Sequence, residues 1–528
     1  MSRGLLLSCL SSILFFISWP PFNGFTFLIF IAFIPLFIIE NDLKNKRISI
    51  TKYFFCVYLT FFLFNLFTTW WIHNAHLAGA IFAISCNAFF MTMVLYITRL
   101  LATIYNWNQS LLLLPLFWVS FEYLHFNWDL SWPWLSLGNV FSSQTNLVQW
   151  YSYTGTLGGT LWVLFINVLL YKIGYLYFNN NSVKREFVLL LSVMIFPMYL
   201  SHLLLNYSSN SSYENHIETL VVQPNFDPYS EKYDLNQEEQ IRITMQLIED
   251  NINDSIEFVL LPESFLIAPI WERSMDNNLS IKQIKDVINK YSNLNMVLGS
   301  TTLALTNRTP VSKPLNNHNT QWYEVYNSAI LLNGVSTDIY HKSKLVPGAE
   351  KMPFIEFLSP ILGDGVLQIG GSYSVGNFGS QDTVSVFKST QNNKIAPVIC
   401  YESIYPNYVR KFINKGAQVI FIITNDGWWK DTSGYKQHNM YAKLRAIETG
   451  RYIARSANTG ISSIINNMGV VEKQIKWDER GIINYTIPLI DTMTFYVKHG
   501  DFLGRLSVFL SVILILCSIV FNKLRFSR

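Results

Sequence analysis

Three ionisable residues, Glu263, Lys342 and Cys400, each follow a short run of residues that is typical of a β-strand. Strand ends are rigid, so the side chains that follow them can be held in register with one another. A carboxylate can take the proton of a thiol, and the resulting thiolate is a good nucleophile. An ammonium group can stabilise the oxyanion that forms when a carbonyl is attacked. These three residue types therefore suffice for nucleophilic attack on a carbonyl carbon.

Cys400 stands where the apolar run Ile395–Ile399 ends and a helix-like segment begins. A strand-to-helix turn fixes the backbone and exposes the side chain, which suits a nucleophile. Cys400 has no disulfide partner in its own region, because the other cysteines all lie inside long apolar runs. These cysteines are Cys9, Cys56, Cys86 and Cys517. The alternative is a buried cysteine that only fills space in a core.

Glu263 and Lys342 each have an ordinary structural interpretation as well. A glutamate that follows a strand can be a carboxylate at a helix N-terminus. A lysine at a strand end can be a solvated surface residue. Spacing alone does not decide between these interpretations and a shared catalytic site.

The composition indicates a membrane protein with a substantial soluble part. Of the 528 residues, 50% are hydrophobic and only 14% are charged, whereas about 25% is typical of soluble domains. No long run of Lys and Arg is present to bind nucleic acid. The sequence also lacks CxxC pairs, an HExxH motif and a Gly-rich phosphate loop. We therefore expect no metal, no cofactor and no nucleic-acid partner.

Apolar runs predict about eight membrane spans, seven before a long soluble region and one after it. The first two are short and are separated by a turn at Trp19-Pro20-Pro21-Phe22-Asn23-Gly24. The predicted spans are Gly4–Trp19, Phe25–Ile39, Tyr53–Ile72, Leu77–Tyr105, Ser110–Leu124, Leu157–Phe178, Phe187–Leu205 and Leu506–Phe521.

The charges of the short loops predict the orientation of these spans. Basic residues fall on one side of the eight-span arrangement, and the positive-inside rule places that side in the cytoplasm. They are Arg3, Lys44, Lys46, Arg47, Lys52, Arg99, Lys172, Lys184, Arg185, Lys523, Arg525 and Arg528. We therefore expect a membrane domain of seven helices over residues 1–205 and a catalytic domain over 206–503 on the opposite side. A last helix with a basic cytoplasmic tail would occupy residues 504–528.

The soluble region alternates strand and helix patterns, which predicts one layered α/β domain with its helices on the outside. Turns at Asn333-Gly334 and across Asn467–Gly469 indicate hairpins. The predicted strands are 217–222, 258–261, 296–299, 328–332, 336–340, 384–387, 395–399 and 419–423, and the predicted helices are 235–250, 281–290, 405–414 and 437–449.

Several ordered motifs carry a resemblance to known proteins. Leu261-Pro262-Glu263-Ser264, then the run Tyr340–Glu350, then Cys400-Tyr401-Glu402 follow the order of the Glu, Lys and Cys of the nitrilase superfamily. A further block begins at Asn425-Asp426-Gly427-Trp428-Trp429 and continues to Gly460. Together with the predicted spans, these motifs resemble the apolipoprotein N-acyltransferase family. The resemblance implies a nitrilase-like αββα sandwich on a multi-pass helical bundle, in a bacterial inner membrane, with the catalytic domain facing the periplasm.

The resemblance also implies roles for the matching residues. Cys400 would be the nucleophile and Glu263 the general base. Lys342, rather than the neighbouring Lys344, would stabilise the oxyanion. Glu350 would orient the lysine and the substrate. The loop before Glu350 departs from the family, which often has Pro-Phe-Gly-Glu where this chain has Pro347-Gly348-Ala349-Glu350.

Five further residues receive supporting roles from the resemblance. Tyr401 and Glu402 would be the neighbours of the nucleophile that matter in this family. Tyr233 stands where family members often carry a tryptophan on a mobile arm. Trp428 would line the substrate cleft, and Arg451 would support a loop.

The activity that the resemblance implies is acyl transfer between two lipids. A fatty acyl chain would pass from a phospholipid to Cys400 as a thioester, and then to the free α-amine of the diacylglyceryl-cysteine of an apolipoprotein. A membrane-tethered amidase or nitrilase that hydrolyses a small amide is the alternative enzyme. A non-catalytic membrane assembly or transport protein is the other alternative, although the spans are poor in the charged residues that mark transport paths.

Overall fold

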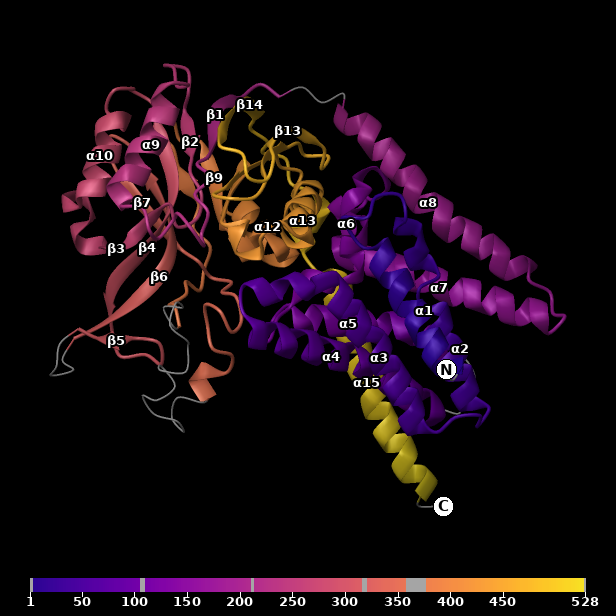
Figure 1. The fold of residues 1–528 in the computed structure, drawn as a ribbon. Helices are drawn as coiled ribbons and strands as arrows, with labels where there is room; N and C mark the ends of the chain where they lie inside the picture. The colour runs from indigo at the N-terminus through magenta and orange to yellow at the C-terminus, as the bar shows by residue number, and fades with distance from the viewer. Residues whose placement is uncertain (1–2, 105–109, 210–212, 316–320, 358–376, 527–528) are drawn as a thin grey trace. The chain divides into compact units, whose positions relative to one another are not determined.

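The computed structural model describes residues 3–104, 110–209, 213–315, 321–357 and 377–526 (Figure 1). The chain divides into two compact units. One comprises Met1–Asn210 together with His499–Arg528, and the other comprises Ser211–Lys498.

The first unit is a bundle of apolar helices joined by short 3-10 turns. Its contacts pair α1 with α3, α3 with α4, α5 with α15 and α7 with α8. The main helices are α1 (Arg3–Ser18), α2 (Ile34–Lys44), α3 (Ile50–Thr69), α4 (Leu77–Ile104), α5 (Leu114–His125), α7 (Thr156–Phe178), α8 (Lys184–Ser209) and α15 (Phe502–Phe526).

The prediction of about eight spans is approximate. Among the described residues, six helical stretches are long and apolar enough to cross a membrane. The two remaining predicted spans are shorter helices, because α1 has 16 residues and α5 has 12. The six stretches are Thr26–Lys44, Ile50–Asn74, Leu77–Ile104, Thr156–Phe178, Lys184–Tyr207 and Phe502–Val520. This set of apolar helices indicates a membrane protein.

The second unit contains two β-sheets of mixed strand direction. The larger has the order β14-β1-β2-β4-β6-β5, with β3 also paired to β4 and β7 to β6, and the smaller has the order β13-β12-β11-β10-β9-β8. The strands are β1 (His216–Gln223), β2 (Phe258–Leu260), β3 (Leu266–Trp271), β4 (Asn295–Thr306), β5 (Lys313–Pro314), β6 (Trp322–Leu332), β7 (Thr337–His341), β8 (Phe387–Lys388), β9 (Lys394–Ile399), β10 (Val419–Thr424), β11 (Ile453–Ala457), β12 (Ser462–Ile465), β13 (Val471–Ile475) and β14 (Gly481–Pro488).

The two sheets pack face to face, with helices on both outer faces. Strand β2 shows why, because alternate residues of a strand point to opposite faces. Val259 belongs to the apolar core beneath α9 (Gln237–Glu249) and α10 (Leu279–Ile288). Its neighbour Phe258 instead contacts Phe421 of the smaller sheet, with ring centroids 5.4 Å apart.

Two further helices, α12 (Pro406–Asn414) and α13 (Ser433–Thr449), contact the smaller sheet through β9 and β12 (Figure 1). The predicted αββα sandwich is therefore confirmed.

Strand direction brings several strand ends to one edge of the sandwich. In the larger sheet β1, β2 and β4 run parallel. Strand β7 runs parallel to β4 as well, because each of them is antiparallel to β6. In the smaller sheet β9, β10 and β11 run parallel. Residues that follow β2, β7 and β9 can therefore meet.

The strand lengths differ from the prediction in several places. Strand β4 has 12 residues and β6 has 11, because the two pair along their whole length and extend well beyond the apolar runs that predicted them. The predicted strand 384–387 is reduced to the short β8. Strands β3, β5, β11 and β14 had not been predicted.

Candidate active site

Cys400 occupies a strained turn at the end of β9. It is the first residue of the 3-10 helix η9 (Cys400–Ile404), and its φ is +49°. A left-handed conformation at a residue other than glycine costs on the order of 1–3 kcal/mol, so its surroundings must hold it. The Glu402 carboxylate accepts a hydrogen bond from Ile399 N–H at 2.9 Å. The Ser403 hydroxyl donates to the Cys400 carbonyl oxygen at 2.7 Å.

Glu263 follows β2 and is fixed by contact with β4. The Leu261 N–H donates to Val297 O at 2.8 Å, which extends the pairing of these strands to the end of β2. Gly299 of β4 lies directly beneath Glu263, and a Cβ at this position would come within 2.5 Å of Glu263 Cα. Only glycine allows the two backbones to approach this closely. The packing of β2 against β4 therefore fixes the backbone that carries the Glu263 carboxylate.

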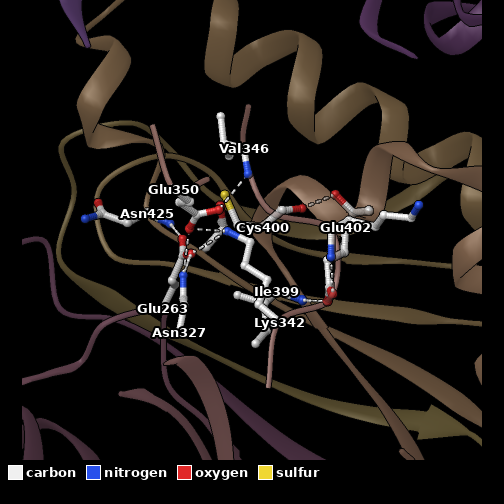
Figure 2. Close-up of polar contacts among 12 residues, drawn as sticks. Glu263, Asn327, Lys342, Val346, Glu350, Ile399, Cys400, Glu402 and Asn425 are labelled. Atoms are coloured by element: carbon white, nitrogen blue, oxygen red, sulfur yellow. Dashed lines mark hydrogen bonds and ion pairs between the residues drawn. The ribbon is translucent and has the colours of Figure 1, made fainter. Parts of the chain in front are cut away.

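Lys342 follows β7, and its backbone N–H donates to Asn327 O at 2.8 Å. Its ammonium group lies between two carboxylates (Figure 2). Nζ is 3.2 Å from Glu263 Oε1 and 2.8 Å from Glu350 Oε1. The Asn327 side chain bridges the same two groups, because Nδ2 donates to Glu263 Oε1 at 2.8 Å and to Glu350 Oε1 at 3.0 Å. Asn425 N–H donates to the other Glu263 oxygen at 3.1 Å.

The loop that departs from the family pattern still delivers Glu350 to the lysine. Gly348 takes a φ of +80°, which glycine adopts without strain. Its N–H donates to Lys351 O at 2.8 Å and closes a tight turn. The Val346 N–H donates to Glu350 Oε2 at 2.8 Å and fixes the carboxylate on the inner side of that turn.

The charges of the site keep the thiol neutral and its partners ionised. Burial raises the pKa of Glu263, but Lys342 and the hydrogen bond from Asn327 outweigh burial, so this pKa lies below its ordinary value. Burial lowers the pKa of Lys342, but Glu263 and Glu350 raise it well above its ordinary value. Burial and the charge of Glu263 raise the pKa of the Cys400 thiol well above its ordinary value. Glu263 and Lys342 are the two charges that act most strongly on the thiol, so a base and a cation both stand close to it.

Comparison with known proteins places this chain in a family. Residues 221–494 match the family described as carbon-nitrogen hydrolase, and residues 11–169 match the family described as apolipoprotein N-acyltransferase N-terminal domain. The apolipoprotein N-acyltransferase of Rickettsia typhi is 30% identical to this chain over 78% of this chain and 77% of its own length. That of Chlorobaculum tepidum is 26% identical over 98% of this chain and 97% of its own.

The chain belongs to the apolipoprotein N-acyltransferase family. It is therefore an acyltransferase whose soluble unit carries the carbon-nitrogen hydrolase fold. Among solved structures, an amidase of the nitrilase superfamily from Nesterenkonia AN1 matches 56% of this chain and 99% of its own, with 14% identity and a TM-score of 0.37.

Glu402 connects the turn at Cys400 to the segment that follows Lys342. It is fully buried, and one carboxylate oxygen accepts from the Tyr340 hydroxyl at 2.6 Å, from Ser343 N–H at 2.7 Å and from Lys344 N–H at 3.2 Å. Burial raises its pKa, although these hydrogen bonds oppose the rise. Tyr401 is buried beside it, against the ring of Tyr405 at 5.3 Å.

Tyr233 and Trp428 lie together at the surface of the acyltransferase unit. Their rings are 6.1 Å apart, and Tyr229 adds a third ring 5.8 Å from Trp428. The exposed fraction is 55% for Tyr233 and 37% for Trp428, so both rings are available to a ligand. Lys232, beside Tyr233, is buried with Nζ 3.5 Å from Glu263 O. This contact links the segment that carries Tyr233 to Glu263.

Arg451, which was expected to support a loop, binds backbone carbonyl groups away from Cys400. Its guanidinium donates to Ala417 O at 3.0 Å and to Thr492 O at 2.6 Å. Ala417 precedes β10 and Cys400 follows the parallel strand β9, so the two residues are at opposite ends of the smaller sheet. Arg451 therefore supports the loop at Thr492 on the far edge.

Sequence reasoning missed Asn327 and Asn425, which both bind Glu263. Asn327 is a buried polar residue of β6, and a polar residue in a buried strand is a usable signal. Asn425 acts through its backbone N–H, so its side chain carried no information. Three charged or titratable residues of the last motif block received no role from the sequence, and the structure buries all of them: His438, Arg445 and Arg455.

Proposed function

We propose that this apolipoprotein N-acyltransferase takes a fatty acyl chain from a phospholipid, holds it as a thioester on Cys400, and passes it to the α-amine of a diacylglyceryl-cysteine. One observation carries the proposal. The charges of Glu263 and Lys342 both act on the Cys400 thiol, and the Lys342 ammonium is held between the carboxylates of Glu263 and Glu350. A base and an oxyanion donor are thus fixed around one nucleophile.

In the first half-reaction Sγ attacks the carbonyl carbon of the phospholipid ester, and Glu263 takes the thiol proton as the bond forms. The negative charge that develops on the carbonyl oxygen is stabilised by the Lys342 ammonium. The carbon–oxygen bond to the glycerol then breaks, and the leaving oxygen takes the proton from Glu263. The products are a lysophospholipid and a thioester on Cys400.

In the second half-reaction the neutral α-amine of the apolipoprotein attacks the thioester carbonyl. Glu263 takes a proton from the attacking nitrogen, and Lys342 again stabilises the oxyanion. The carbon–sulfur bond breaks, and the departing sulfur takes the proton, which restores the thiol. Because the two substrates use one site in turn, we expect ping-pong kinetics.

The two proposed substrates are found in the membrane, where the apolar helices would also hold the enzyme. Both the phospholipid donor and the diacylated acceptor are lipids, and the apolar helices of the first unit would hold the enzyme in the layer that contains them. A membrane-tethered amidase with the same residues would instead pass the acyl group to water. The nature of the acceptor therefore distinguishes the two candidate activities.

Wild-type enzyme incubated with phospholipid alone is expected to gain the mass of one acyl chain on the peptide that contains Cys400. Hydroxylamine should remove this adduct, because it cleaves thioesters, and lysophospholipid should appear in equal amount. Intact-mass and peptide mass spectrometry measure both. Release of lysophospholipid only when the apolipoprotein is present, with no adduct, would contradict the thioester. Rapid loss of the adduct to water would favour the hydrolase.

We further propose that the enzyme lies in the bacterial inner membrane with residues 206–503 in the periplasm, as the positive-inside rule predicts. Lys46 and Leu279 are both exposed and serve as reporters. In a variant without native cysteines, a membrane-impermeant thiol reagent added to spheroplasts should label Leu279→Cys and spare Lys46→Cys. Labelling of Lys46→Cys alone would reverse the orientation. Permeabilised cells supply the control, because both positions should then react.

A further inference from the structure

Behind Cys400 lies a chain of buried polar side chains to which the proposed chemistry gives no role. Its members are Arg455 of β11, Asp426 of the 3-10 helix η10 (Asp426–Trp429), His438 of α13 and Ser403 of η9. The exposed fraction of each is 1% or less. Burying this many polar groups is unfavourable unless they bind one another, so their arrangement needs an explanation.

These four side chains form a hydrogen-bonded network that runs from the guanidinium of Arg455 to the backbone of Cys400. Arg455 Nη2 donates to Asp426 Oδ2 at 2.6 Å and lies 3.0 Å from His438 Nδ1. His438 Nε2 is 2.9 Å from Ser403 Oγ and 3.2 Å from the Cys400 carbonyl oxygen. The Ser403 hydroxyl donates to that same carbonyl at 2.7 Å.

A carbonyl oxygen can only accept, so the contact between His438 Nε2 and the Cys400 carbonyl is a hydrogen bond when Nε2 carries a proton. We assign this tautomer, in which the Ser403 hydroxyl donates to the same carbonyl. Two states of Nδ1 fit this arrangement. In the neutral ring Nδ1 accepts from Arg455, and in the protonated ring Nδ1–H donates to Asp426 Oδ1 at 2.9 Å. In both states the imidazole donates toward Cys400.

The end of this network farthest from Cys400 is held by the charges of Asp426 and Arg455. Burial raises the pKa of Asp426, but Arg455 and His438 outweigh burial and lower this pKa to about 2. The carboxylate therefore stays ionised at neutral pH and anchors the imidazole. Thr424 Oγ1 adds a hydrogen bond to Asp426 Oδ1 at 2.9 Å. The ring of His438 consequently has a fixed orientation when it meets the turn at Cys400.

We propose that His438 is a positioning residue for the nucleophile. The imidazole, held by Asp426 and Arg455, fixes the carbonyl of Cys400, maintains its left-handed backbone and so aims the thiol at Glu263. This inference rests on the proposed function only in taking Cys400 as the nucleophile. A displacement of the nucleophile by about 1 Å can slow acyl transfer by about 10²-fold. A contact that fixes the Cys400 backbone can therefore have a large effect on the rate.

The test compares His438→Leu, His438→Gln and Asn439→Leu in the full-length protein. Asn439 is the matched control, because it is the next residue of α13, is also buried, and binds Ser463 at 2.9 Å. The melting temperature measures the structural cost of each change. Two rates measure positioning: formation of the acyl adduct with phospholipid, and alkylation of Cys400 by iodoacetamide at pH 7, followed on the Cys400 peptide.

We expect His438→Leu to slow both rates by about 10- to 100-fold relative to Asn439→Leu at a similar melting temperature. His438→Gln should recover most of the loss, because its amide can donate to the same carbonyl. Equal rates for His438→Leu and Asn439→Leu, or no recovery with His438→Gln, would overturn the proposal.

Should His438→Leu fail to fold, Ser403→Ala removes one donor from the same carbonyl and should slow both rates to a smaller extent; unchanged rates would again overturn the proposal. Absence of the adduct in the wild type would refute the thioester, while the alkylation rates would still test His438.

Discussion

Cys400→Ala is expected to abolish both half-reactions and to leave a folded protein. Removing the nucleophile of an acyl-transfer enzyme lowers the rate by a factor on the order of 10⁶. In the proposed mechanism the Cys400 thiol is the group that attacks, and Glu263 and Lys342 both act on it. Neither lysophospholipid release nor an acyl adduct should therefore be detectable.

The stability of this variant should change little, because alanine is close to cysteine in size and the left-handed turn at Cys400 is held by hydrogen bonds to backbone groups. These bonds come from Glu402 and Ser403 and do not involve the thiol. Cys86→Ala, in a helix of the first unit, is the matched control and should retain full activity. Measurable adduct on Cys400→Ala would identify a different acylated residue and contradict the assignment.

The three positions proposed as catalytic could be singled out in the sequence because their signals are local. Each of Glu263, Lys342 and Cys400 follows a strand, and strand ends can be recognised from a few neighbouring residues. The order of the strands in each sheet could not be predicted, since pairing between β2 and β4 or between β9 and β10 depends on contacts far apart in the sequence. The convergence of the three side chains followed from the resemblance alone.

The supporting residues show where sequence reasoning ends. Arg451 and Arg455 stand four positions apart in one motif block, and both are fully buried. Arg451 precedes β11 and Arg455 lies within it, so the strand carries the second arginine toward Cys400 and leaves the first at the opposite end. Only the direction and register of β11 distinguish them. The departure at Pro347–Glu350 was also undecidable, because a positive φ at Gly348 had to be observed.

Lys342 is the cation shared by the carboxylates of Glu263 and Glu350 in a buried ion cluster. Lys342→Met is expected to lower the rate of adduct formation by about 10²–10³, the usual cost of removing an oxyanion donor. It also leaves Glu263 and Glu350 without their shared cation. Breaking a buried ion pair by removing one partner costs about 3–5 kcal/mol. Lys344→Met is the matched control, because Lys344 is the neighbouring lysine and packs over the Tyr405 ring instead.

The pKa of Glu263 determines how the stability of Lys342→Met changes with pH. In the wild type the pKa of Glu263 is depressed, so the stability it contributes is present above its unfolded pKa and is lost as pH falls through the folded pKa. Without Lys342, burial dominates and raises this pKa above its ordinary value. The ionised carboxylate then destabilises the fold, and the loss grows as pH rises. Lys342→Met should therefore melt at a higher temperature, relative to wild type, at pH 5 than at pH 8.

A second substitution distinguishes the effect of Lys342 on stability from its effect on the formation of the acyl adduct. Adding Glu263→Gln to Lys342→Met removes one of the unpaired carboxylates, and the amide oxygen can keep one of the two hydrogen bonds that Glu263 accepts from Asn327 and from Asn425 N–H. The double variant should recover part of the lost melting temperature at pH 8, yet form no acyl adduct, because the base is now absent. Glu263→Gln alone should also form none. A double variant that is less stable than Lys342→Met at pH 8 would show that the two charges are not coupled, and would remove the electrostatic basis assigned to the site.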